Sequence, residues 1–166
     1  FARLCEKRDD IEFDVYSSFK LYGWEQRDEQ FKDLFKFMDE HPKINNYGSV
    51  SNKDIREALT KAHILAYPST WQETSCLVLM ESMSAQLQCV HSNLAALPET
   101  AADFTMMYQY QEDKNMHANI FYHVLNEAIE NYDIAAATRT GKPNAFAYFT
   151  QIAWYAFLRR IAKEKK

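Results

Sequence analysis

Along the chain, segments in which apolar residues recur at helical spacing alternate with short apolar segments that are typical of β-strands. Between residues 28 and 40, apolar side chains recur at i, i+3, i+4 and i+7, which is the spacing of one helix face. The run from His63 to Tyr67 is apolar without alternation, as in a strand buried on both sides of a parallel sheet, and Pro68 ends it. Helices are predicted over residues 28–40, 52–62, 73–85 and 113–131, and strands over residues 12–19, 44–50, 63–67, 87–91 and 105–110.

The order of these elements predicts an α/β fold. Strands and helices follow each other regularly, which is typical of a Rossmann-like parallel sheet with helices on both faces. The helical pattern breaks between Asp133 and Pro143. We therefore predict one domain over residues 1–131, a junction over residues 132–143 and a separate C-terminal helix over residues 144–166.

The loop after the third predicted strand carries the polar groups with the clearest chemistry. In a parallel α/β sheet, ligands bind at the carboxyl ends of the strands, where the free N–H groups of a helix N-terminus attract phosphate. The loop from Pro68 to Ser75 has this position, so a pyrophosphate would lie against the amides of Thr74 and Ser75. Glu73 and Glu81 are predicted to lie near one face of the following helix, where two carboxylates can bind two sets of sugar hydroxyls.

The same segment resembles the E-x7-E element of retaining group 1 glycosyltransferases (family 4-like), which have the GT-B fold. It reads Glu-Thr-Ser-Cys-Leu-Val-Leu-Met-Glu over residues 73–81, follows Ala-Tyr-Pro-Ser over residues 66–69 and precedes Leu-Pro-Glu over residues 97–99. The resemblance runs from about residue 11 to about residue 130, and within the family the sequence is similar to phage-encoded members. It implies the C-terminal, donor-binding half of a GT-B enzyme that uses a nucleoside diphosphate sugar.

The resemblance also implies roles for individual residues. In the family, the first Glu faces the donor hexose and the second holds the ribose hydroxyls, which makes Glu73 the expected catalytic residue. Donor binding is expected from Ser69, Thr74, Ser75 and Glu81. The parent enzyme would transfer a sugar to an unknown acceptor with retention of the anomeric configuration, and the resemblance implies neither a cofactor nor a metal.

The sequence departs from the family pattern at several positions. Family members often have Phe-Gly after the first Glu and a Gly after the helix, where this chain has Ser75-Cys76 and Gln86. The first strand of the GT-B half, the Arg/Lys pair that binds the diphosphate and the acceptor-binding N-terminal domain are all expected upstream of Phe1. We therefore expect an N-terminally truncated fragment that is inactive by itself.

Charge and cysteine content add two constraints. The net charge is −4, but residues 139–166 hold seven Lys/Arg and one acidic residue, which indicates a basic appendage on an acidic domain. The cysteines Cys5, Cys76 and Cys89 are far apart and are expected to be reduced, buried thiols. With neither a signal peptide nor an apolar run of about 20 residues, the sequence predicts a cytoplasmic protein, in the host cytoplasm if it is phage-encoded, without a membrane span.

The C-terminal segment predicts a basic amphipathic helix over residues 144–166. A terminal helix that packs on the domain and a membrane-surface helix are both compatible with this pattern. The segment also resembles part of the late-transcription RNA polymerase sigma factors of tailed phages, which implies RNA polymerase or DNA as a partner. The two resemblances meet near residues 128–133 and suggest a recombined or misjoined reading frame. A sigma-like transcription module and an inert remnant are therefore the alternatives to a glycosyltransferase.

Overall fold

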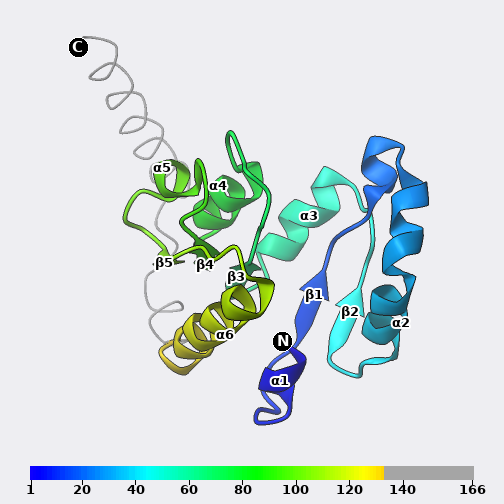
Figure 1. Cartoon of the computed structure of the whole chain (residues 1–166), viewed down its shortest axis with the longest axis horizontal. Coiled ribbons are helices and arrows are strands. Elements are labelled where there is room, and N and C mark those ends of the chain that lie inside the picture. Colours follow the sequence, from blue (N-terminus) through cyan, green and yellow to red (C-terminus); the bar gives the residue numbers. More distant parts are fainter. Residues whose placement is uncertain (133–166) are drawn as a thin grey trace. The chain divides into compact units, whose positions relative to one another are not determined.

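The computed structural model describes residues 1–132, apart from the side chains of Leu21, Tyr22 and Glu25, and divides the chain into two compact units (Figure 1). Unit 1 is Phe1–Ala58, and unit 2 is Leu59–Lys166, of which residues 59–132 are described. The C-terminal helix predicted over residues 144–166 lies outside the described residues. The prediction of that helix, and of the junction before it, stays a prediction.

Unit 1 is built around two short parallel strands. Phe13 of the first strand lies opposite Ile44 of the second. Its elements are α1 (Ala2–Cys5), β1 (Phe13–Val15), the 3₁₀ helices η1 (Phe19–Tyr22) and η2 (Glu25–Phe31), α2 (Lys32–Glu40), β2 (Ile44–Asn46) and most of α3 (Asn52–Leu59).

Local hydrogen bonds explain where unit 1 differs from the predicted element boundaries. The strand predicted over residues 12–19 ends at Val15, because the Ser18 hydroxyl accepts the Lys20 N–H and donates to Asp28, which turns the chain into η1. The next α-helix begins at Lys32 rather than at residue 28. The helix predicted over residues 52–62 begins at Asn52, as expected, but ends at Leu59.

The cap of α3 is formed by two neighbouring residues. The Ser51 hydroxyl accepts the Asp54 N–H at 3.2 Å, and the Ser51 N–H donates to the Asp54 carboxylate at 3.2 Å. This reciprocal pair satisfies two backbone donors in the manner of a capping box, which explains why the helix begins here.

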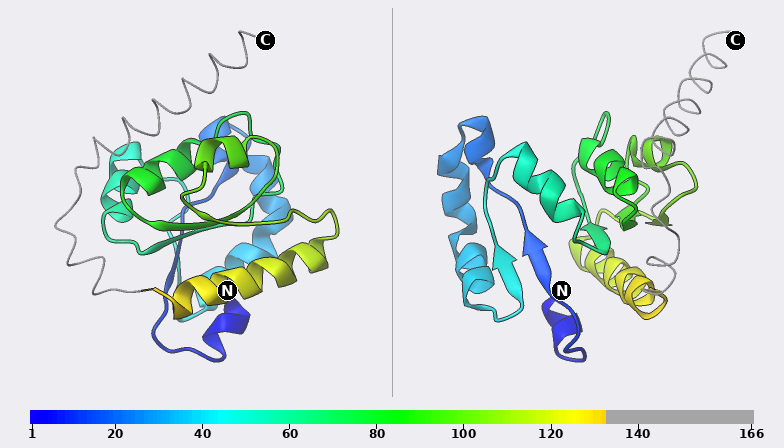
Figure 2. Two further views of the ribbon diagram at one scale, coloured as in Figure 1. Left: turned by 90° about the vertical axis from the view of Figure 1, so that its left-hand side faces the viewer. Right: turned by 180° about the vertical axis from the view of Figure 1, so that it is seen from behind.

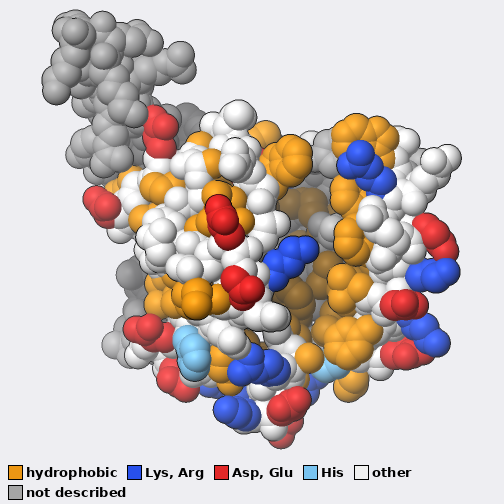
Figure 3. Space-filling view, in the orientation of Figure 1, with side chains coloured by type: hydrophobic (Ala, Val, Ile, Leu, Met, Phe, Trp, Pro, Cys, Tyr) orange, Lys and Arg blue, Asp and Glu red, His pale blue; other side chains and the backbone are white. Residues whose placement is uncertain are grey.

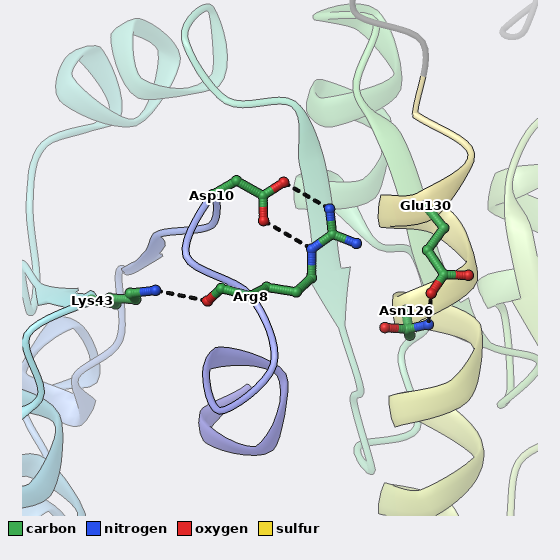
Figure 4. A network of polar contacts seen from close by, with 5 residues as sticks. All are labelled: Arg8, Asp10, Lys43, Asn126 and Glu130. Carbon is green, nitrogen blue, oxygen red and sulfur yellow. Dashed lines mark hydrogen bonds and ion pairs between the residues drawn. The ribbon is translucent and has the colours of Figure 1, made fainter.

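Surface ion pairs of unit 1 connect short segments. The Arg8 guanidinium donates to both carboxylate oxygens of Asp10, at 2.9 and 2.7 Å, and Lys43 Nζ donates to the Arg8 carbonyl at 2.7 Å (Figure 4). The chain before β1 is thereby joined to the chain before β2. Along the edge formed by α2, Lys/Arg and Asp/Glu side chains are mixed (Figure 3), as in an ordinary solvated helix face.

Unit 2 contains a three-stranded parallel sheet with helices on both faces. Its elements are β3 (Ile64–Tyr67), α4 (Leu77–Ser84), β4 (Gln88–Ser92), α5 (Leu97–Ala101), β5 (Met106–Tyr108) and α6 (Lys114–Glu130), and the strand order is β3-β4-β5. Figure 2 shows α4 on one face of this sheet and α6 on the other. The predicted α/β fold with parallel strands is confirmed, and so are helices on both faces of the unit 2 sheet.

The core of unit 2 lies between its sheet and α4. The buried side chains of this cluster are Cys76, Leu79, Met83, Leu87, Cys89, Leu97 and Ala101. On the opposite face, α6 buries His117, Leu125 and Ala128. Burial of apolar area on both faces is what the uninterrupted apolar strand over residues 63–67 predicts.

One predicted helix of unit 2 begins later than expected, and one helix of unit 2 was not predicted. The helix expected from Glu73 begins at Leu77, so Glu73 lies in the preceding loop. No helix was predicted over residues 97–101, whereas α5 forms there with Pro98 in its first turn, where a proline needs no N–H partner. The predicted helix over residues 113–131 is confirmed, and Asp113 caps α6 by accepting the Met116 N–H at 2.8 Å.

Within residues 1–132, no helix is both long enough and apolar enough to cross a membrane. The cysteines differ in exposure: Cys76 and Cys89 are buried, but Cys5 is only partly so, which corrects the expectation of three buried thiols. Burial raises the pKa of all three thiols, and raises that of Cys89 to about 12.

Thiol reactivity is expected to follow this difference in exposure. A disulfide reagent such as DTNB should modify Cys5 of the folded chain at least about ten times faster than Cys76 or Cys89, because a buried thiol reacts only after local opening. The progress curve at pH 7.5 should contain one fast phase, which Cys5→Ser removes. A fast phase that persists in Cys5→Ser would contradict the burial of the other two thiols.

Candidate functional site

The loop between β3 and α4 is built by its own polar groups. Ser69 Oγ accepts the Trp71 N–H at 3.1 Å, and the Glu73 N–H donates to the Trp71 carbonyl at 3.1 Å. These bonds fold residues 69–73 into tight turns at the carboxyl end of β3. Trp71 projects from the loop with 75% of its surface exposed.

Glu73 is held from two directions. The Tyr67 hydroxyl donates to Glu73 Oε1 at 2.8 Å, and the Glu73 carbonyl accepts the Ala96 N–H at 3.3 Å. Tyr67 is the last residue of β3, and Ala96 lies in the loop after β4. Glu73 therefore connects the carboxyl ends of two neighbouring strands. Burial raises the pKa of Tyr67 strongly, and the bond to Glu73 raises it further, so the hydroxyl stays a donor.

The N-terminus of α4 is open to an anion. Cys76 is its N-cap and makes no side-chain capping bond, and the first turn contains no acidic residue. The first intrahelical bond of this segment runs from the Met80 N–H to the Cys76 carbonyl, so the N–H groups before Met80 lack partners of this kind. Thr74 and Ser75 are exposed just before this helix end. The arrangement is suited to bind phosphate.

Glu81 lies on the solvent face of α4, one turn after the exposed Leu77. Leu79, Ser82 and Met83 take the buried face of the same helix. The expectation that Glu73 and Glu81 share a helix face is wrong, because Glu73 precedes the helix. Both glutamates belong to one loop–helix segment, and their common action on a donor stays a prediction.

The structure also brings together polar residues that the sequence motifs did not include. Asn93, directly after β4, accepts the Tyr110 N–H at 2.8 Å and donates to Gln109 Oε1 at 2.8 Å. Tyr108 at the end of β5 contacts His117 Nε2 through its hydroxyl at 3.0 Å. The sequence indicates these contacts only weakly, because it shows no more than single polar residues at the ends of short apolar strands.

His91 is a buried histidine at the core end of β4 and has partners for both ring nitrogens. One ring nitrogen lies 2.8 Å from the Ser92 carbonyl and the other lies 2.7 Å from Thr105 Oγ1, so both are satisfied. Among residues 1–132, His, Cys, Asp and Glu side chains form no group of three or more that could hold a metal ion.

Two open depressions of about 720 and 360 Å³ lie in unit 1, and neither is lined by residues of the loop after β3. The larger is lined mainly by charged side chains of both signs from η2 and α2. Neither depression is lined by the residues of the E-x7-E segment. The candidate site is therefore the loop between β3 and α4 together with the N-terminus of α4.

A family model described as "Glycosyl transferases group 1" matches residues 1–139. The chain therefore belongs to the group 1 glycosyl transferases, and its parallel α/β architecture is consistent with the C-terminal, Rossmann-like domain of a GT-B enzyme. No curated protein and no solved structure gives a significant match. Residues 140–166 lie beyond the family match, and the resemblance of residues 144–166 to sigma factors stays a prediction.

Proposed function

We propose that this domain binds the nucleoside diphosphate sugar of a retaining glycosyltransferase at the loop after β3 and the N-terminus of α4. In this proposal Glu73 faces the hexose and Glu81 the ribose hydroxyls. Ser69 and the amides of Thr74 and Ser75 face the hexose and the diphosphate. The observation that carries it is the Glu73 carboxylate, held by Tyr67 just before an uncapped helix end, within a domain of the group 1 family.

The chemistry of these groups suits transfer from a diphosphate. When the bond between the sugar and the diphosphate breaks, negative charge develops on the leaving phosphate oxygen. Free N–H groups and the positive end of the α4 dipole would stabilise that charge without moving. A carboxylate at the hexose accepts hydroxyl hydrogen bonds, which orient the ring.

Nucleotide binding is the direct test of the proposal. Thermal unfolding of the 166-residue chain should occur at a higher temperature with millimolar UDP, GDP, ADP or dTDP, because a ligand of the folded state stabilises that state. Glu81→Ala should weaken the best of these ligands at least about tenfold, because hydrogen bonds to a charged group are lost.

The control is Glu127→Ala, which removes an exposed glutamate from a helix of the same unit. This variant should keep the affinity and the thermal shift of the unsubstituted chain. Equal losses in both variants, or no shift with any of the four nucleotides, would overturn the proposed donor site.

A further inference from the structure

Glu73 has a fixed and a free carboxylate oxygen. Oε1 accepts the Tyr67 hydroxyl at 2.8 Å, whereas Oε2 makes no hydrogen bond to any residue of the described chain. The backbone of Glu73 is held as well, because its N–H donates to Trp71 and its carbonyl accepts from Ala96. Three hydrogen bonds therefore restrict this residue and leave one acceptor atom available.

Tyr67 is placed to act as a fixed donor. It is the last residue of β3, lies in register with His91 of β4, and packs its ring against the buried cluster beneath α4. A tyrosine ring that packs on a core has little rotational freedom, so its hydroxyl is a well-defined point in space. Burial and the bond to Glu73 keep that hydroxyl protonated at every physiological pH.

The Tyr67 hydroxyl, as a neutral hydrogen-bond donor, restricts the rotation of the Glu73 side chain. The side chain of a free Glu rotates about three bonds, and ordering such a side chain at a ligand costs affinity. A hydroxyl that already binds one carboxylate oxygen restricts this rotation before the ligand arrives. The second oxygen then keeps its capacity to accept hydrogen bonds from sugar hydroxyls.

We propose that Tyr67 is a positioning residue, which orients the Glu73 carboxylate so that Oε2 meets the hydroxyls of the donor hexose. The inference rests on the proposed function, since it requires Glu73 to face the sugar. The Tyr67 hydroxyl donates its hydrogen bond to the glutamate that faces the hexose in this proposal, so Tyr67→Phe should affect recognition of the hexose more than recognition of the nucleotide. The nucleoside diphosphate is therefore an internal reference for the effect.

The test compares two matched pairs of probes, UDP with UDP-glucose and GDP with GDP-mannose, by calorimetry on the 166-residue chain. In Tyr67→Phe, the Kd of the better nucleotide sugar should rise roughly fivefold to twentyfold, as for the loss of a hydrogen bond to a charged group. The Kd of the nucleoside diphosphate alone should change less than about twofold. In a Glu73→Ala background, Tyr67→Phe should have no further effect on the nucleotide sugar.

Tyr108→Phe is the control. It removes a hydroxyl at the end of β5 that bonds to His117 and not to Glu73, so both affinities should stay unchanged. Glu73→Asp provides the same test from the other partner, because its shorter side chain keeps a carboxylate but moves it away from the Tyr67 hydroxyl. It should cause the same selective loss, whether or not Tyr67→Phe folds well.

The possible results separate the two proposals. A selective loss for the nucleotide sugar that disappears in Glu73→Ala supports the positioning role. An equal change for sugar and diphosphate, no change, or the same loss in Tyr108→Phe overturns that role and leaves the donor site standing. Failure of the unsubstituted chain to bind any of the four probes, together with no thermal shift with ADP or dTDP, overturns the donor site, and the positioning role with it.

Discussion

Leu79→Ala is expected to lower the free energy of unfolding by about 2–5 kcal/mol, which is the cost of removing a buried leucine side chain and leaving a cavity. Leu79 has no exposed surface and packs in the buried cluster between α4 and the sheet. Because the same helix carries Glu81 on its other face and offers its N-terminus to the proposed donor, a loosened α4 should also weaken nucleotide binding. Urea unfolding followed by circular dichroism measures the first effect.

Leu77 provides the control on the same helix. Its side chain is 70% exposed, so Leu77→Ala removes the same atoms without opening a cavity in the core. A surface substitution of this kind should change the free energy of unfolding by no more than about 0.5 kcal/mol. Equal losses for Leu77→Ala and Leu79→Ala would contradict the packing of α4 described above.

His91→Leu is expected to cost about 1–3 kcal/mol at pH 7.5, because two hydrogen bonds inside the core are lost at about 1 kcal/mol or more each. The substitution puts an apolar side chain of similar size at this position of β4. What it removes are the contacts to the Ser92 carbonyl and to Thr105 Oγ1, at 2.8 and 2.7 Å. Urea unfolding of both proteins gives the difference. A variant as stable as the unsubstituted chain would show that these bonds contribute nothing.

The same histidine predicts how stability depends on pH. Burial lowers the pKa of His91 below its ordinary value of 6.5, and the bond to the Ser92 carbonyl opposes that change only in part. In the unfolded chain, His91 therefore binds a proton near pH 6.5, whereas in the folded chain it binds that proton only at a lower pH. The stability due to neutral His91 is complete above pH 6.5 and is lost as the pH falls below it.

Unfolding at a series of pH values from 7.5 to 5 measures this dependence. The unsubstituted chain should lose more stability over that range than His91→Leu. The control is His123→Leu, because His123 lies exposed on α6, and this variant should keep the pH dependence of the unsubstituted chain. An identical slope for His91→Leu and the unsubstituted chain would contradict the inference.

Short-range patterns predicted much of unit 2. The apolar run that Pro68 ends is β3, and the helix after Asp113 is α6 with that residue as its cap. Both depend on neighbouring residues alone, through strand propensity, the missing N–H of proline and a capping carboxylate. The start of α4 was predicted wrongly because it depends on contacts with other elements. Hydrogen bonds from Tyr67 and Ala96 hold Glu73 outside the helix.

The sequence by itself determined the alternation of the five strands with the four longer helices, the parallel α/β class and the segment from Ser69 to Glu81 that carries the family motif. These features follow from spacing and composition within a few turns of chain. Only the tertiary structure decided which groups meet. The pairing of Tyr67 with Glu73 and of Tyr108 with His117 depends on how strand ends, loops and helices pack. A hydrogen bond requires two atoms to lie about 3 Å apart, and spacing along the chain does not specify that distance.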